Sequence, residues 1–489
     1  MKKKYYSAFF AGILISSCAY SQQISDDIAS NEISEANLQK HVEYLASDKL
    51  EGRGTGSEGY RLAEIYVESI FQNANLLKIC TGENGNQNYS QHVIMERVIL
   101  EEKTKAIITR TGYQKAYGYG DNLILAHFGK LNNETLKGEV ISVGDGIHEP
   151  QLNIDDYKNE SIINKWVLMN ESISNEILEK LPVSLKRTYR DVYTSLMART
   201  EEARKKGAIG VIVAPSEQGM KYWKIREQAF REYYSLPVHR GPYRSAEIPI
   251  VLIDTTIFKE LDMENSKSFF ELKKYIKKEK TIAANNVIGM VKGTNNNDNY
   301  IIVGAHLDHL GKKDGKIYNG ADDNASGVAG ILELAKSISE NPCENNVVFV
   351  AFAAEEIGSL GSCYFINNLP FDIKNIKAML NFDMIGRSDG DTKELAIISM
   401  NFESDRLAAI IKNCQTEGET VDWAYMETFN RIHSGDHFPF VLMNIPGIWL
   451  FSGLHSDYHQ TSDDSERIDY EFLYNNTKFA EKLLRKLDE

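Results

Sequence analysis

The sequence predicts an α/β protein with a mixed, mostly parallel central sheet flanked by helices, into which a smaller α+β domain is inserted. Three apolar runs carry the prediction, at residues 300–305, 346–352 and 376–382. Short, nearly continuous apolar runs are typical of strands that are buried on both faces. A polar loop follows the first run, and a helical pattern begins at Val328. This order of strand, loop and helix is the repeating unit of an α/β sheet.

Residues that can bind a metal follow each of these strands. They are His306, Asp323, Glu355, Glu356 and Asp383, and Asp308 lies two residues after His306. Ligands of open α/β sheets bind outside the carboxyl ends of the strands, so these side chains are expected to meet. Imidazole and carboxylate groups together form a zinc-type ligand set. Asp308 is expected to accept the second N–H of the His306 imidazole and fix its tautomer, whereas His309 is expected to face the loop.

Five short motifs make the prediction more specific: AHLDHLG, GADDNASG, AAEEIGSLGS, NFDMIG and DYHQTSDD, in this order along the chain. Together they resemble the M28 family of zinc metallopeptidases, and the resemblance covers about residues 35–110 and 280–489. It implies the phosphorylase/hydrolase-like fold of zinc peptidases. It also implies hydrolysis of peptide bonds, in the first place by an aminopeptidase that releases N-terminal residues.

The resemblance further implies two zinc ions per chain, with Asp323 bridging them. His306 and Asp383 would complete one metal site, and Glu356 and His459 would complete the other. Adjacent residues in the sequence, such as the two glutamates after the second strand, need not share a role.

The same resemblance assigns the chemistry. A hydroxide held between the metals would attack the peptide carbonyl, and Glu355 would act as the general base. Tyr458 would help to hold the oxyanion. Glu355, Tyr458 and Asp308 are thus the predicted catalytic residues. Asp436 and His437 are expected to line the substrate pocket.

Other functions stay open from the residues alone. An acidic site suits the free α-amine of an aminopeptidase substrate. A carboxypeptidase or dipeptidase needs a cationic clamp, for which Arg387 and Arg431 are candidates. A glutaminyl-cyclase-like transferase would hold one zinc ion, and a non-catalytic, receptor-like binding protein would hold none. The complete set of ligands and base favours the peptidase.

Composition narrows the class of protein. The chain has 489 residues and a net charge of −14, which disfavours binding to nucleic acids or anionic membranes. A hydrophobic content of 42% supports cores for more than one domain. No later run is apolar enough for a membrane helix. Cys343 and Cys363 flank the strand at 346–352 and are expected to lie too far apart for a disulfide.

The N-terminus has the features of an export signal. Lysines at 2–4 precede a short apolar segment at 8–15, a pattern typical of signal peptides. Cleavage is predicted before Gln22, which gives a signal peptide at 1–21. In the alternative, a lipobox-like signal ends at 17 and leaves a lipidated Cys18. We therefore expect an exported protein, periplasmic or extracellular, with an outer-membrane lipoprotein as the alternative.

The mature chain is expected to contain a peptidase domain interrupted by an insert. In the insert, a helix at 193–206 ends at Gly207 and a strand follows at 210–214. This unit resembles a protease-associated (PA) domain. The segment 221–244 is rich in Tyr, Arg and His and is either a lid or a surface excursion. The predicted segments are 22–120 for the N-terminal part of the peptidase domain, 121–254 for the PA-like insert and 255–489 for the catalytic domain.

Periodicity predicts the remaining elements. Helices are expected from Ser34 and at 58–73, where apolar residues recur on one face. Further strands are expected at 89–100, 105–110, 136–143, 165–169, 250–253, 280–292, 395–398 and 447–451, and a further helix at 404–415.

Overall fold

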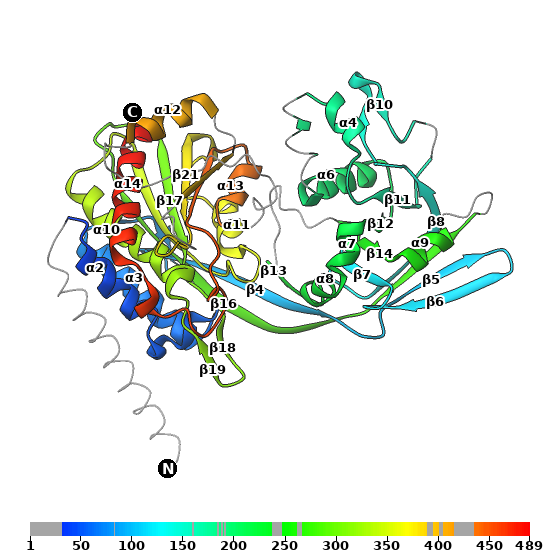
Figure 1. Cartoon of the computed structure of the whole chain (residues 1–489), viewed down its shortest axis with the longest axis horizontal. Coiled ribbons are helices and arrows are strands. Elements are labelled where there is room, and N and C mark those ends of the chain that lie inside the picture. Colours follow the sequence, from blue (N-terminus) through cyan, green and yellow to red (C-terminus); the bar gives the residue numbers. More distant parts are fainter. Residues whose placement is uncertain are drawn as a thin grey trace, which may run out of the picture. The chain divides into compact units, whose positions relative to one another are not determined.

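The computed structural model describes most of the chain from residue 32 to the C-terminus. The predicted signal peptide, Cys18 and Arg431 lie outside the described residues. The chain forms two compact units, one built from the segments up to Met95 and from Ile282 onward, the other from Glu96–Thr281 (Figure 1). The described residues are 32–82, 84–158, 161–182, 185–186, 189, 192–236, 247–261, 267–388, 395–400, 404–414 and 435–489.

The first unit is built on a mixed sheet with a parallel centre. Its strands, in spatial order, are β4 (Ser90–Leu100), β16 (Ile276–Val291), β20 (Asn346–Phe352), β17 (Tyr300–His306), β21 (Ile376–Phe382), β23 (Gly447–Phe451) and β22 (Ala396–Met400). β17 runs parallel to β20 and β21, and β21 runs parallel to β23. β16 and β22 pair antiparallel with β20 and β23. The predicted fold class is confirmed.

Helices cover both faces of this sheet (Figure 1). On one face lie α2 (Glu35–Leu45), α3 (Glu58–Asn73), α10 (Gly327–Glu340), α12 (Ser404–Cys414) and α14 (Tyr470–Asp488), and on the other lie α11 (Leu360–Asn367) and α13 (Phe438–Leu442). Helix α10 is buried on nearly all sides, as expected for a helix enclosed by other elements. Ser34 begins α2 by accepting a hydrogen bond from the Asn37 N–H, the usual way to satisfy a free amide at a helix start.

The three predicted apolar strands form the centre of the sheet. All seven residues of β20 are buried, because helices cover both of its faces. Ile302, Phe352 and Phe365 belong to the core beneath α11 and α13. β20 and β21 have the predicted bounds, and β17 extends one residue further, to His306. The strands therefore end where the candidate ligands begin.

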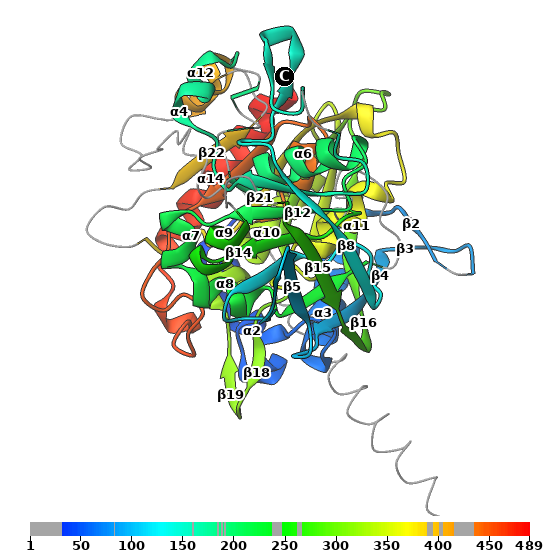
Figure 2. The same cartoon turned by 90° about the vertical axis from the view of Figure 1, so that its right-hand side faces the viewer.

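The second unit contains an eight-stranded sheet whose strands are, in spatial order, β6 (Tyr113–Gly118), β5 (Lys105–Arg110), β15 (Phe269–Lys274), β8 (Glu134–Ser142), β11 (Trp166–Asn170), β12 (Gly210–Ala214), β14 (Ile250–Ile253) and β7 (Leu123–His127). The four strands from β8 to β14 run parallel. Figure 2 looks onto this unit. Its helices are α4 (Asn175–Lys180), α6 (Val192–Lys205), α7 (Glu217–Lys221), α8 (Trp223–Ala229) and α9 (Thr255–Leu261).

The second unit is wider than the predicted insert at 121–254. β5 and β6 precede those bounds, and β15 follows them. β15 lies between β5 and β8 and pairs with both, so residues 96–120 and 255–281 belong to this compact unit. The predicted bounds followed motifs along the chain, whereas pairing between distant strands sets the limits of this unit. Its relation to a PA domain stays a prediction.

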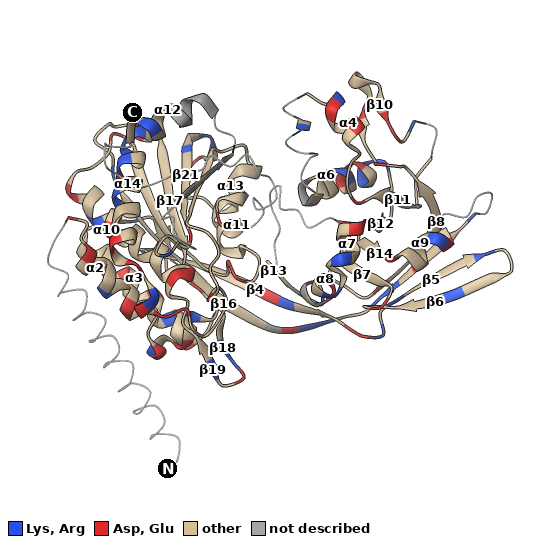
Figure 3. Cartoon of the chain, viewed as in Figure 1, with Lys and Arg blue, Asp and Glu red and all other residues tan. Residues whose placement is uncertain are grey.

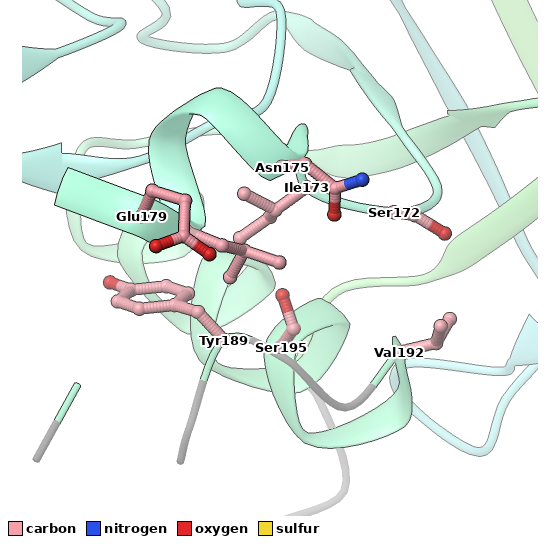
Figure 4. Close-up of a pocket in the computed structure, with 8 residues that line it drawn as sticks. Ser172, Ile173, Asn175, Glu179, Tyr189, Val192 and Ser195 are labelled. Carbon is pink, nitrogen blue, oxygen red and sulfur yellow. The ribbon is translucent and has the colours of Figure 1, made fainter. Parts of the chain in front are cut away.

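The surface of the second unit carries mixed charges. Along α4 and α6, acidic and basic residues lie side by side (Figure 3), as in the ion pair between Lys180 and Glu176. Between Tyr189 and Ser195 lies a pocket of about 340 Å³ (Figure 4). None of the predicted site residues lines it.

The described part of the segment 221–244 forms α8 and β13 (Glu232–Ser235), which pairs with the outer end of β4. A lid function for this segment stays a prediction.

Cys80, Cys343, Cys363 and Cys414 are buried, and none of these four forms a disulfide bond. The expected absence of a bond between Cys343 and Cys363 is confirmed. Among the helices of the described residues, none combines the length and apolarity that a membrane crossing requires.

Candidate metal centre

The carboxyl ends of β17, β20 and β21 bring the predicted ligands together. His306 is the last residue of β17, Glu356 follows β20, and Asp383 follows β21. Because β17 pairs in parallel with both neighbours, the three ends lie at one edge of the sheet. Asp323 enters this edge from the turn Ala321–Ser326, which leads into α10.

His306, Asp323 and Asp383 form the first ligand group. The His306 Nε2 atom lies 3.3 Å from Asp323 Oδ1 and 3.3 Å from Asp383 Oδ1. All three side chains are buried. Burial alone would lower the pKa of His306, but the hydrogen bonds with the two carboxylates outweigh it and raise the pKa well above its ordinary value.

The second group uses the other carboxylate oxygen of Asp323. His459 Nε2 lies 3.2 Å from Asp323 Oδ2 and 3.4 Å from Glu356 Oε2. Burial opposes the charged form of His459, yet its hydrogen bonds with Asp323 and Glu356 raise its pKa to about 10. Burial would likewise raise the pKa of Asp323, but the surrounding imidazoles hold it well below its ordinary value. Asp323 therefore faces one group with each oxygen.

His309 belongs to this second group as well, contrary to the expectation that it faces the loop. Its side chain is buried. The Nδ1 atom lies 2.7 Å from Glu356 Oε1 and 3.6 Å from Asp323 Oδ2. The spacing of the two histidines in AHLDHLG does not predict this, because β17 ends at His306 and the chain beyond it no longer alternates regularly.

The spacing of these atoms fits a metal ion. Ligand atoms about 2.0–2.1 Å from a tetrahedral zinc ion lie about 3.3 Å from one another. The separations between imidazole and carboxylate atoms are 3.2–3.4 Å for His306 and His459. The 2.7 Å between His309 and Glu356 is instead the length of a hydrogen bond. The side chains around Asp323 thus have both the chemistry and the spacing of zinc ligands.

Asp308 makes other contacts than the sequence predicted. The second ring nitrogen of His306 faces the main-chain carbonyl of Asp308, at 3.1 Å. The Asp308 carboxylate accepts hydrogen bonds from the Glu355 N–H, at 3.0 Å, and from the Thr55 hydroxyl, at 2.6 Å. The carbonyl can still select the His306 tautomer. The carboxylate instead holds the main chain of Glu355. β17 ends at His306, so residue 308 no longer follows the regular alternation of side chains along a strand.

The pKa values of the adjacent Glu355 and Glu356 are shifted in opposite directions. Burial, reinforced by the negative charges of Glu356 and Asp436, raises the pKa of Glu355 well above its ordinary value. Burial and Asp323 act in the same sense on Glu356, but hydrogen bonds with His309 and His459 outweigh them and lower its pKa. Pairs of carboxylates with pKa values pushed apart are typical of sites that divide acid–base roles.

Tyr458, Asp436 and His437 also lie near this edge. The Tyr458 ring stacks on His459, with 3.8 Å between ring centroids. Burial raises the Tyr458 pKa, so the phenol keeps its proton at neutral pH. Asp436 and His437 are fully buried, and burial raises the pKa of Asp436 to about 7. The His437 ring stacks on Trp449, at 5.2 Å. That these two residues line a substrate pocket stays a prediction.

Asp463 and Asp322 hold the turn that carries Asp323. The Asp463 carboxylate accepts hydrogen bonds from the Asp322 and Asp323 N–H groups, each at 3.1 Å. Asp322 accepts a hydrogen bond from the Gly386 N–H at 2.8 Å, and its second oxygen lies 3.2 Å from His455 Nε2. Sequence reasoning missed these roles. Asp463 lies within the DYHQTSDD motif, from which only the tyrosine and histidine were assigned.

Residues 286–484 match the model of peptidase family M28. Aminopeptidase YwaD of Bacillus subtilis is 28% identical over 196 residues, which cover 38% of this chain and 41% of that protein. The probable lipoprotein aminopeptidase LpqL of Mycobacterium tuberculosis is 31% identical over 210 residues, which cover 42% of this chain and 37% of that protein. The chain thus spans about two fifths of the length of these two relatives.

A solved structure shares the architecture along nearly the whole chain. The aminopeptidase from Aneurinibacillus sp. strain AM-1 matches with a TM-score of 0.51 over 95% of both chains, at 19% identity. At this identity the likeness concerns the fold alone. The segment matched by the family model contains His306, Asp323, Glu356, Asp383 and His459. Residues 286–484, which carry the candidate metal centre, thus resemble peptidase family M28.

Proposed function

We propose that this protein is an exported aminopeptidase that uses two zinc ions to release N-terminal residues from peptides. Asp323 carries the proposal, because its two oxygens face two separate ligand groups. A carboxylate in this position can bridge two metal ions. The match of residues 286–484 to peptidase family M28 supports a peptidase function. The likeness to two relatives named as aminopeptidases supports the release of N-terminal residues.

The distances between imidazole nitrogens and carboxylate oxygens favour one set of metal ligands. His306 and Asp383 would hold the first ion together with Asp323. Glu356 and His459 would hold the second, because their separations match those between zinc ligands. His309 would donate a hydrogen bond to the free oxygen of Glu356 and orient it, as residues behind metal ligands commonly do.

Zinc, when bound, supplies Lewis acidity that polarises the substrate carbonyl and lowers the pKa of water. Glu355 supplies the base, because it is an unligated carboxylate next to a ligating one. Its raised pKa suits a group that first takes a proton and then delivers it to the leaving amine. Tyr458 stays protonated and can donate a hydrogen bond to the oxyanion.

Arg387 favours an aminopeptidase over a carboxypeptidase. Its guanidinium donates to Asp457 at 2.9 Å and lies 4.0 Å from Asp463. The positive charge is therefore already compensated and is poorly available to a substrate carboxylate. The buried acidic groups suit the free α-amine of a peptide. The N-terminal pattern and the likeness to a probable lipoprotein aminopeptidase support export.

Metal content and substrate choice test the proposal together. Purified protein should contain two zinc ions per chain by elemental analysis. It should hydrolyse aminoacyl p-nitroanilides but not their N-acetylated counterparts. Phenanthroline should abolish this activity, and added zinc should restore it. One zinc ion per chain with full activity would overturn the two-metal site, and preference for the blocked substrates would overturn the aminopeptidase. Protein that binds no metal would point to a receptor-like function.

A further inference from the structure

A short helical segment before α3, Asp48–Arg53, contacts the segments that carry the proposed metal ligands. It contains Arg53, whose side chain is 1% exposed. The guanidinium donates hydrogen bonds to the main-chain carbonyls of Leu307, at 2.9 Å, and of Gly320, also at 2.9 Å. It also donates to the carbonyls of Asn319, at 2.7 Å, and Leu45, at 2.5 Å. All four acceptors are main-chain atoms.

These carbonyls belong to the two segments that carry the ligands. Leu307 follows His306 directly. Asn319 and Gly320 immediately precede the turn with Asp323. One planar group, which has its donors in a fixed arrangement, therefore ties the first imidazole ligand to the shared carboxylate. The distance between these two segments is thus set by hydrogen bonds within the chain, which do not require a bound metal.

The segment Asp48–Arg53 is itself held in a single position. The Arg53 carbonyl accepts a hydrogen bond from the His309 N–H at 3.2 Å. Arg53 and Gly52 have φ of 51° and 69°, a region that favours glycine. A Cβ atom at Gly52 would lie 2.1 Å from the Tyr318 carbonyl oxygen. The close approach of this segment to the chain beyond the first motif thus requires glycine before Arg53.

Arg53 also brings a positive charge to an acidic centre. Asp323, Asp463, Asp308 and Glu356 all stabilise its charged form. Burial is the larger influence and lowers its pKa to about 10, which still leaves the group charged at neutral pH. None of its hydrogen bonds in the described structure goes to these carboxylates. Arg53 therefore occupies no oxygen of Asp323 or Glu356, the two proposed metal ligands among them.

We propose that Arg53 is a positioning residue that sets the spacing of the His306 and Asp323 segments before metal binds and offsets the carboxylate charge without occupying their oxygens. This inference rests on the proposed metallopeptidase function. A purely structural role would resemble that of Arg199 in the second unit, which is also 1% exposed. Arg199 donates to the carbonyls of Asp145, Asn170 and Glu171, away from any proposed ligand.

The test compares zinc affinity in the full-length protein and three variants: Arg53→Met, Arg53→Lys and, as the matched control, Arg199→Met. Metal-free protein is titrated with zinc in competition with a chromophoric chelator, and thermal unfolding is recorded with and without zinc. We expect Arg53→Met to weaken zinc binding about 10-fold to 100-fold, the usual effect of residues behind the ligands. Arg53→Lys keeps the charge but not the fork of donors, so its loss should be smaller. Arg199→Met should lower the melting temperature and leave zinc affinity unchanged.

Wild-type affinity in Arg53→Met, or an equal loss in Arg199→Met, would overturn the inference. If Arg53→Met does not fold, Arg53→Lys decides: reduced zinc affinity with an unchanged circular-dichroism spectrum supports the positioning role, and wild-type affinity overturns it. Failure of the proposed function looks different, because the wild-type protein itself would then not bind two zinc ions.

Discussion

Both units contain parallel strands, but the carboxylates that follow these strands have different contact partners in the two units. In the first unit, Asp383 and Glu356 face imidazoles and other carboxylates. In the second, Asp254 after β14 accepts hydrogen bonds from the first amides of α9. Glu171 after β11 forms an ion pair with Arg226. Within the described residues, both groups of potential metal ligands lie in the first unit. An acid at a strand end thus becomes a candidate ligand only where no cation or helix start has already engaged it.

The largest effect should come from the base of the first unit. Glu355→Gln keeps the shape of the side chain but removes the proton acceptor. We expect kcat to fall by about 10²–10⁴ while zinc stays bound. Glu356→Gln should instead weaken zinc binding. Steady-state kinetics and elemental analysis of both variants check this assignment. Zinc lost from Glu355→Gln but kept by Glu356→Gln would reverse the two roles.

Removal of a buried positive charge in the second unit should lower the stability of the fold and leave the affinity for zinc unchanged. Lys274 is fully buried, and its ammonium group donates to the carbonyls of Phe128 and Lys130 and to Glu134. Lys274→Met removes the ammonium donor that these three acceptors share and should cost about 2–4 kcal/mol. Denaturant unfolding measures the loss, and a zinc titration of the folded variant should match the wild type. A large loss of zinc affinity would show that the units are coupled.

The two histidines that face Glu356 should differ in importance. His459→Ala removes a proposed ligand, whereas His309→Ala removes only a hydrogen bond that orients one. We expect His309→Ala to lower the affinity for the second zinc ion about 10-fold to 100-fold. His459→Ala should lower this affinity further. Competition titrations that resolve the two binding steps provide the measurement. The reverse ranking would make His309 the ligand.

The smallest effect should appear as a pH dependence of the first unit. His41 is fully buried, with Nδ1 2.7 Å from the Tyr66 hydroxyl. Burial lowers the pKa of His41. Glu333 Oε1 lies 3.3 Å from His41 Nε2. Burial would raise the pKa of Glu333, but the hydrogen bonds from His41 and Lys336 outweigh it and lower the pKa.

Both groups bind protons less readily in the folded state than in the unfolded chain. Their contribution is therefore complete above about pH 6.5 and declines on acidification, first through His41 and then, below about pH 4.5, through Glu333. Glu333→Gln should lower the free energy of unfolding by about 1–3 kcal/mol at pH 7 and by less at pH 4. Lys274→Met should keep the acid slope of the wild type, and an unchanged slope in Glu333→Gln would contradict the prediction.

Local patterns allowed much of the first unit to be predicted. β20, β21, β23 and α3 have the predicted bounds, because continuous apolar runs and helical periodicity are local properties of the chain. The limits of the second unit depend on pairing of β15 with strands far away in the sequence, which local patterns do not indicate. α14 was not predicted, although it packs against α2 and α10.

The candidate site shows the same division. The residues at strand ends could be identified because topology places them at one edge. The contacts between them could not, because they depend on how loops return to that edge. Asp308 turns to Thr55 and to a backbone amide, and His309 turns inward. Arg53 lies more than 250 residues before the carbonyls of Leu307, Asn319 and Gly320 that it binds. No periodicity in the sequence reports such a contact.

The chain leaves the first unit along β4 and returns along β16, and these two strands are neighbours in one sheet. The points of departure and return of the second unit are therefore adjacent. A hairpin turn could replace everything between them without altering the order of any other strand. Whole modules can be gained, lost or exchanged at such a junction in a single genetic step, while the zinc ligands proposed for the first unit keep their places along the chain.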